Sequence, residues 1–363
     1  MGEISNEAAR SSSNLQAEFE KVSSLVSEQF QIEESLLENG VPTYSLKQPQ
    51  ETKRAFLRLL EKLTPLTLIA ILRRSDNGRI VLRVVPKPLV KPSNILINWL
   101  LLLATIGTTF ISGYLLSADV VNPFLGGAAF TIALLAVLGT HEMGHKITAN
   151  KKGMEATVPY FIPGPPPFGT FGAVIMQKSL PPNKDALFDV GANGPIAGFV
   201  IATIVSIVGL TLLIPSPPTV NATQFNQVPV LWRLLLQILS GLNLLPKASP
   251  GQDLLLHPVA FAGWVGIVVT MLNLLPAAML DGGHVARSLA GEKTRLVLTV
   301  LSIAFLFVEG FLPMALFVVF ISMFKHPGPL DDVSDLSRSR KILAVVLVII
   351  FILCVFPEQP FWT

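Results

Sequence analysis

The chain has few charged residues and almost no cysteine, and each shortage excludes a class of protein. Asp, Glu, Lys and Arg make up 14% of the 363 residues, while 51% are hydrophobic. Soluble domains have about 25% charged residues, so this composition indicates an integral membrane protein. The single cysteine, Cys354, excludes an intramolecular disulfide and a thiolate zinc site. The first forty residues lack the apolar core of a cleavable signal peptide, so we expect none.

The charges that are present are concentrated before the first long apolar segment. Residues 1–95 contain 13 of the 27 Lys and Arg residues and 11 of the 24 Asp and Glu residues. We therefore expect a polar N-terminal region and a membrane-embedded body over residues 95–357. The net charge of +3 gives no indication of a nucleic-acid partner, and the expected environment is the lipid bilayer.

The N-terminal region is expected to be disordered over residues 1–12 and to form a small cytoplasmic α+β domain over residues 13–90. Apolar residues at helical spacing predict an amphipathic helix over residues 13–39 that stops at Asn39-Gly40. The other expected elements are strands at residues 43–46, 66–72 and 80–85 and a helix at residues 51–63. Asn77-Gly78 between the last two strands is typical of a hairpin turn. No catalytic set of residues occurs here, which favours a regulatory or scaffolding role.

Long apolar segments predict a multi-pass α-helical membrane protein with about six or seven transmembrane helices, because one span needs about 20 residues. The expected spans are residues 95–116, 124–148, 194–214, 257–275, two short spans within 296–324, and 342–356. Residues 228–245 could lie in the interface or re-enter the membrane. Lys and Arg are concentrated in alternate loops, which predicts a cell-membrane protein with a cytoplasmic N-terminus.

An H-E-x-x-H motif lies at the end of the second expected span, at His141-Glu142-Met143-Gly144-His145. Histidines four residues apart share one face of a helix and can bind one metal ion, while the glutamate can sit beside the metal-bound water. The preceding segment, residues 124–139, has no charged residue. Ionisable groups in such a segment are costly and mark function. The motif favours a zinc hydrolase within the membrane, with a metal transporter as the alternative.

A catalytic zinc site requires a third protein ligand. Asp281 ends the fourth expected span, at a membrane depth similar to that of His141, and Gly282-Gly283 permit a close approach to the site. The competing carboxylates are expected in cytoplasmic loops or at the far side of the membrane: Glu155, Asp189 and Glu309. We therefore favour Asp281. His284 either supports this ligand or is structural.

Two further motifs accompany the H-E-x-x-H sequence: Gly191-Ala192-Asn193-Gly194-Pro195-Ile196-Ala197-Gly198 and the stretch from Asn273 to Gly283. Gly194 and Gly198 have the small-x-x-x-small spacing of helix packing. With these motifs, residues from about 90 onward resemble the site-2 protease family of intramembrane zinc metalloproteases, in its archaeal, cyanobacterial and plastid-like branch without a PDZ insertion.

This resemblance implies a set of roles for the motif residues. His141, His145 and Asp281 would bind one Zn²⁺ ion, Glu142 would be the general base, and Asn273 would position the substrate or stabilise the oxyanion. The substrates would be transmembrane segments of other proteins, cleaved in regulated intramembrane proteolysis. An inactive relative that binds membrane proteins without cutting them is the remaining alternative.

Residues 157–179 are apolar but too rich in Pro and Gly for a spanning helix. Non-helical backbone at membrane depth must lie against protein or a water-filled cavity. The resemblance implies a re-entrant loop with strand character beside the site, and an interfacial linker is the alternative. Residues 171–177 lack proline, and we expect them to form a strand that pairs with an unwound substrate. The expected substrate-binding residues are Phe171, Gly172, Ala173, Val174 and Ile175.

Overall fold

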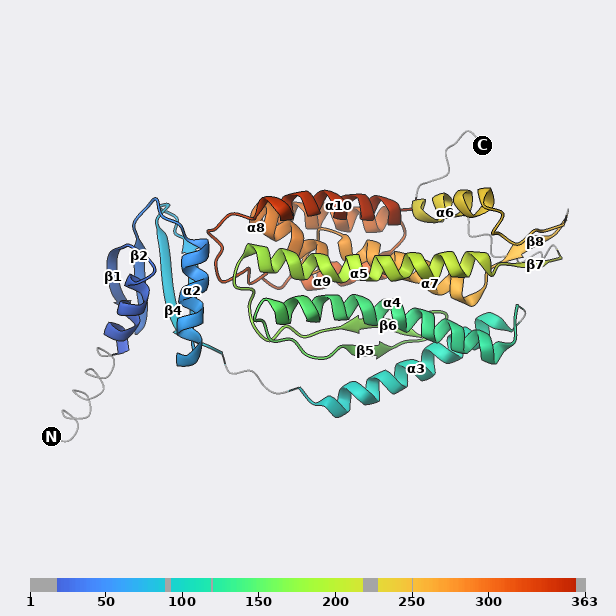
Figure 1. Ribbon diagram of the computed structural model, residues 1–363, viewed down its shortest axis with the longest axis horizontal. Coiled ribbons are helices and arrows are strands. Elements are labelled where there is room, and N and C mark those ends of the chain that lie inside the picture. Colours follow the sequence, from blue (N-terminus) through green and yellow to red (C-terminus); the bar gives the residue numbers. More distant parts are fainter. Residues whose placement is uncertain (1–17, 89–92, 119, 218–227, 250, 357–363) are drawn as a thin grey trace. The chain divides into compact units, whose positions relative to one another are not determined.

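The computed structural model of the chain describes residues 18–88, 93–118, 120–217, 228–249 and 251–356 (Figure 1). The segment predicted to be disordered, residues 1–12, lies outside the described residues. The chain divides into two compact units. The first, called here the N-terminal unit, comprises Met1–Lys91, Leu180–Leu187 and Pro327–Ser337, and all other residues form the second, the helical unit.

The N-terminal unit contains a four-stranded antiparallel sheet in the order β1-β2-β4-β3. Its elements are β1 (Ile32–Glu38), β2 (Val41–Leu46), α2 (Lys53–Leu63), the 3-10 helix η1 (Thr64–Leu66), β3 (Leu68–Arg74) and β4 (Ile80–Pro86). Residues 18–27 are also helical. Alternate residues of the strands and the apolar face of α2 meet in one core, in which Tyr44, Phe56 and Leu82 are fully buried.

The predicted helix over residues 13–39 is wrong for residues 32–38, which form strand β1. Asn39 and Gly40 both have positive φ angles, 50° and 79°. A two-residue type I′ hairpin turn requires this backbone conformation at both central positions, so Asn39-Gly40 joins β1 to β2 instead of ending a helix. The helical spacing of apolar residues holds only before Phe30.

Two segments from far along the chain complete the N-terminal unit. Leu330 is buried in its core. The backbone N–H of Leu72 donates to the Leu330 carbonyl at 2.9 Å, and the N–H of Asp332 donates back to Leu72 at 3.2 Å. Residues 330–332 therefore run parallel to β3. Lys53 pairs with Asp185 at 2.8 Å, which ties the second segment to the start of α2.

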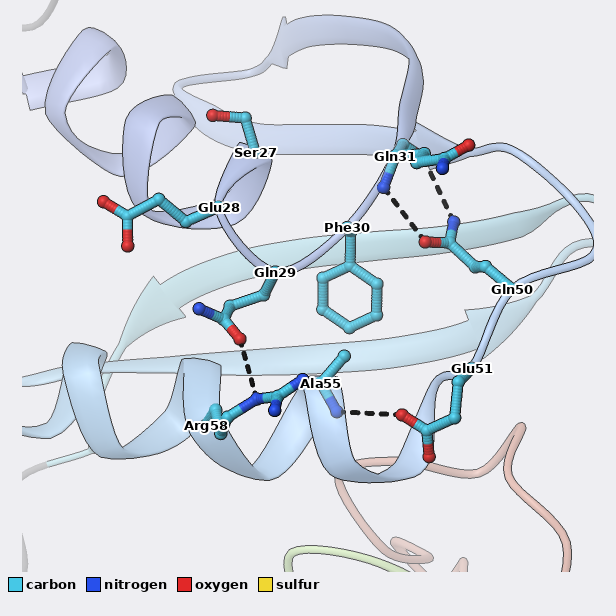
Figure 2. A pocket seen from close by; sticks show the side chains of 9 residues that line it. All are labelled: Ser27, Glu28, Gln29, Phe30, Gln31, Gln50, Glu51, Ala55 and Arg58. Carbon is cyan, nitrogen blue, oxygen red and sulfur yellow. Dashed lines mark hydrogen bonds between the residues drawn. The ribbon is translucent and has the colours of Figure 1, made fainter.

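A cavity of about 310 Å³ lies in the N-terminal unit, near the start of α2 (Figure 2). The Gln50 amide exchanges two hydrogen bonds with the backbone of Gln31, each 3.0 Å long. Arg58 donates to the side chain of Gln29 at 2.9 Å. These polar groups pair with one another, so the cavity provides no argument for a ligand.

The helical unit contains helices and two short hairpins. The helices are α3 (Ile95–Ser117), α4 (Pro123–Lys151), α5 (Lys184–Thr211, which belongs to this unit from Phe188 onward), α6 (Val230–Gly241), α7 (Pro258–Leu274), α8 (Asp281–Val308), α9 (Leu312–Ser322) and α10 (Arg338–Cys354). The hairpins are β5 (Tyr160–Pro163) with β6 (Thr170–Val174) and β7 (Ile214–Ser216) with β8 (Asp253–Leu255). Among the described residues, α3, α4 and α5 are long and apolar enough to cross a membrane, and α6, α7 and α9 are shorter apolar helices.

Helix α5 differs from its prediction at its start. The span was expected from Gly194, but the helix begins at Lys184 and contains Pro195 in its interior. Asp189, expected in a loop, is therefore a buried residue of a helix. The apolar stretch at residues 296–324 also differs, because its first part continues a helix that starts at Asp281 and changes direction at Gly291, where φ is 81°.

The segment at residues 157–179 forms the β5–β6 hairpin and lies against α3. The Asn98 amide of α3 donates to the carbonyls of Val158 and Pro159, each at 3.1 Å. Thr108 of the same helix donates to the Gly169 carbonyl in the hairpin loop at 2.6 Å. The hairpin also runs alongside α4 (Figure 1). Its non-helical backbone is thus supported by protein on the side of these two helices.

Candidate metal centre

Three potential metal ligands from two helices converge in the helical unit. Nε2 of His141 and Nε2 of His145, both on α4, are 3.1 Å apart. Each lies 3.2 Å from Oδ2 of Asp281, the first residue of α8. Zinc binds nitrogen and oxygen ligands at about 2.0–2.2 Å, so tetrahedral ligands stand about 3.3 Å apart. The triangle of donor atoms has the dimensions and chemistry of a zinc site with one position left open.

Helix α4 places the two histidines because one turn separates them. Both side chains are buried, with exposed fractions of 3% for His141 and 5% for His145. Nδ1 of His145 lies 2.8 Å from the Val190 carbonyl of α5. A carbonyl can only accept, so Nδ1 carries the proton and the Nε2 lone pair is free to bind a metal.

Each of the three candidate ligand residues is approached by one glycine of α5. A Cβ atom at Gly194 would lie 2.1 Å from Nε2 of His145, and one at Gly198 would lie 2.9 Å from Nδ1 of His141. A Cβ at Gly191 would lie 2.7 Å from the Asp281 carbonyl oxygen. The spacing expected for helix packing therefore brings the α5 backbone directly against the three candidate metal ligands.

Asp281 is positioned by a tight connection between α7 and α8. A Cβ at Gly282 would lie 2.1 Å from the Leu274 carbonyl oxygen, and one at Gly283 would lie 2.5 Å from the Ala277 carbonyl oxygen. Only glycine permits this folding of the loop against the helix start. The carboxylate of Asp281 stands in the first turn of α8, where the helix dipole favours negative charge.

Glu142 and Asn273 lie at the same site. Glu142 is 7% exposed and hydrogen-bonds to the backbone of Ile175, just after β6. Nδ2 of Asn273, near the end of α7, is 3.4 Å from Nε2 of His141. The structure thus brings together both metal-motif histidines, the carboxylate of Asp281, the motif glutamate and the amide, with the end of the β6 strand beside them.

Other residues singled out from the sequence take different places. Nδ1 of His284 is 2.8 Å from Nε2 of His326, and burial lowers the pKa of His326 to about 3, so its imidazole is neutral at pH 7. Asp189 pairs with Arg340 and Lys152. Glu155 is exposed, and Glu309 ends α8. Within the described ranges, His141, His145 and Asp281 are the one group of His, Cys, Asp and Glu residues spaced to hold a metal.

Comparison with known proteins assigns the family. The family model described as Peptidase family M50 matches residues 129–311, which include the H-E-x-x-H motif, Asn273 and Asp281. The chain belongs to Peptidase family M50. The resemblance to the site-2 protease family is thereby confirmed, and the glycines of α5 lie within the matched residues of this peptidase domain.

The M50 domain has curated relatives in plants. The chain is 33% identical over 244 residues to "Probable zinc metalloprotease EGY1, chloroplastic" of Oryza sativa subsp. japonica, covering 65% of this chain and 42% of the relative. It is 31% identical over 235 residues to "Probable zinc metalloprotease EGY2, chloroplastic" of Arabidopsis thaliana, covering 62% and 40%. The matches thus span less than half the length of these relatives. No solved structure matches the chain.

Two features of the centre were missed from the sequence. The carbonyl of Val190 contacts His145 through the backbone, which no residue type reveals. The pairing of Asp189 with Lys152 and Arg340 was also missed, because Asp189 was expected in a loop. Apolar residues on both sides of Asp189 were the available signal, since a carboxylate in such a setting is buried only with a partner.

Proposed function

We propose that this chain is an intramembrane zinc metalloendopeptidase that cleaves peptide bonds within transmembrane segments of other membrane proteins. The observation that carries the proposal is the triangle of His141, His145 and Asp281, with Glu142 beside it but outside the ligand set. Membership of Peptidase family M50 and relatives named probable zinc metalloproteases support zinc as the metal and hydrolysis as the reaction.

The residues around the metal centre have different roles in hydrolysis. When bound, zinc supplies a Lewis acid that activates water at neutral pH. Glu142 takes a proton from the attacking water and delivers it to the leaving amine, which is the role of a general base and then a general acid. The amide of Asn273 lies next to His141. It donates a hydrogen bond to the substrate carbonyl oxygen as negative charge develops on that oxygen.

The β6 strand is the proposed substrate-binding edge. Among the described strands β6 pairs with β5 alone, while the side chains of Phe171 and Val174 are 74% and 47% exposed. A helical substrate must unwind before attack, which exposes backbone groups that are costly in hydrocarbon. Adding the unwound segment to residues 171–175 satisfies those groups. The hydrogen bond between Glu142 and the backbone of Ile175 supports this proposal, because Ile175 directly follows β6.

The proposed membrane topology is six or seven spans, with the N-terminal unit on the Lys- and Arg-rich side of the membrane. The alternation of basic loops supports this orientation. The relatives' names place those proteins in the chloroplast, and for this chain we propose a multi-pass membrane protein. In a Cys354-free background, an impermeant thiol reagent should label Ser249→Cys from outside and spare Gly153→Cys. The reverse pattern would invert the topology.

The test of function uses the full chain in detergent or bilayer discs with labelled single-span proteins. Wild type should cleave them, a zinc chelator should stop cleavage, and added zinc should restore it. Glu142→Gln should lower the rate by about a hundredfold or more, since general acid–base catalysis contributes about 10²–10⁴. Its zinc content should equal that of wild type. Cleavage by Glu142→Gln at the wild-type rate would exclude Glu142 as the base, and no cleavage by wild type would favour an inactive relative.

A further inference from the structure

A buried carboxylate ties three helices together next to the metal centre. Asp189 of α5 is 8% exposed and accepts two hydrogen bonds from Arg340 of α10, at 3.0 Å from Nε and 2.7 Å from Nη2. Nζ of Lys152, at the C-terminal end of α4, lies 2.7 Å from the same carboxylate. The residue after Asp189 is Val190, whose carbonyl accepts from His145. The carboxylate is therefore one residue away from a contact that orients a metal ligand.

The contacts between α4 and α5 follow one antiparallel register. Along α4 from its end inward, the contacting pairs include Lys152 with Asp189, Thr148 with Asn193, His145 with Gly194, and His141 with Gly198. Two of these pairs are polar, and the hydrogen bond from Asn193 to Thr148 is 2.9 Å long. The other two join a flat imidazole ring to a glycine. A glycine has no side chain to interlock, so among these four pairs the two polar ones are better suited to resist a slip of α5 along α4.

We propose that Asp189 is a positioning residue for the metal centre. Its pairing with Lys152 sets the register of α5 on α4, and this register holds the Val190 carbonyl at Nδ1 of His145. A slip of one residue would move a carbonyl about 1.5 Å along the helix and turn it by about 100°. Nδ1 would then lose the partner that fixes its proton and the ring orientation. This inference rests on the proposed metal site but not on the cleavage of any substrate.

The two cations at Asp189 have different roles under this proposal. Lys152 caps the C-terminal end of α4, the helix that carries the two histidines, so its pairing with Asp189 controls the register. Arg340 belongs to α10, which supplies no ligand to the centre, and it balances the buried charge. Removing either cation leaves Asp189 with one partner, so the two variants compare equal losses of charge at different places.

The experiment measures the zinc dissociation constant of the purified full chain by competition with a chromophoric chelator. Loss of an outer partner of a metal-binding histidine weakens metal binding by about 10–100-fold. We expect Lys152→Gln and Asp189→Asn to weaken zinc binding by about tenfold or more. Lys152→Arg keeps the positive charge and should bind zinc with wild-type affinity. Arg340→Gln should stay within about twofold of wild type. The matched control is Asp185→Asn, a carboxylate one turn earlier on α5 that pairs with Lys53 in the N-terminal unit; it should keep wild-type affinity.

Several results would overturn the proposal. One is wild-type zinc affinity in Lys152→Gln. Another is a loss of zinc affinity in Arg340→Gln or Asp185→Asn equal to that in Lys152→Gln. A third is a zinc affinity in Lys152→Arg as low as that in Lys152→Gln. If Asp189→Asn does not fold, the two Lys152 variants decide the question, because they leave the Asp189–Arg340 pair in place. Zinc affinity is read without substrate, so failure of the proposed protease function would leave this measurement interpretable.

Discussion

Replacing Gly194 with alanine tests how closely α5 must approach the metal ligands. A Cβ at this position would lie 2.1 Å from Nε2, 2.3 Å from Cε1 and 2.5 Å from Cδ2 of His145. Non-bonded carbon atoms are comfortable at about 3.5–4.0 Å. The imidazole ring, or the whole of α5, must therefore retreat by more than about 1 Å. The overlap falls on the ligand atom itself.

The expected effect is a large loss of zinc affinity without a loss of helix. Metal–ligand distances in a working site vary by only about 0.2 Å, so a ring displaced by about 1 Å no longer serves as a ligand. We expect zinc binding to weaken by at least about a hundredfold, which is the upper end of what loss of an outer contact costs. Alanine is favoured over glycine in a helix by about 1 kcal/mol, so α5 itself should persist.

The assay is again zinc competition, run beside thermal unfolding, and two glycine variants serve as controls. Gly209→Ala places a Cβ 2.3 Å from the Ala260 backbone of α7, an overlap of similar severity in the same helix. It should lower the unfolding temperature but leave zinc affinity intact. Gly107→Ala in α3 meets nothing within 4 Å and should be neutral or stabilising. Wild-type zinc affinity in Gly194→Ala, or an equal loss in Gly209→Ala, would refute the argument.

Two further predictions concern the third ligand and the substrate edge. Asp281→Ala should lower zinc content and activity together, measured by metal analysis after dialysis; stoichiometric zinc in this variant would move the third ligand elsewhere, with His284 the first to test. Proline at Ala173 or Val174 should sharply reduce cleavage of a transmembrane substrate at normal zinc content, because proline removes a backbone donor. Val174→Ala should do much less, and equal damage by alanine would exclude backbone pairing.

The residues of the metal centre could be proposed from the sequence because their geometry is local or marked by a motif. The helical period brings His141 and His145 together once α4 is recognised, and the glycines after Asp281 signal a close approach. The hairpin at residues 157–179 was accessible for the opposite reason, since its Pro and Gly content excludes a helix. In each case a short stretch of sequence determines the local backbone.

The predictions from the sequence were wrong where the secondary structure depends on pairing with a distant part of the chain. Apolar spacing in residues 32–38 suits a helix as well as a strand, and the antiparallel partner β2 decides for the strand. The place of Leu330 in the N-terminal core also depends on distant pairing, because Leu330 follows β3 by more than 240 residues. Gly191, Gly194 and Pro195 are poor helix formers, so the sequence suggested a late start of α5.

The weak helix formers in α5 are explained by what the metal centre requires. Gly191, Gly194 and Gly198 each lie against a different ligand residue, and any side chain there would displace it. Little space then remains for a side chain to orient His145, and the backbone carbonyl of Val190 takes that role. A carbonyl cannot be changed by substitution, so the support of the ligand depends on where the whole helix lies. Polar contacts near the N-terminal end of α5, with Asp189 foremost, are therefore the place where this chain can adjust its metal affinity without altering a ligand.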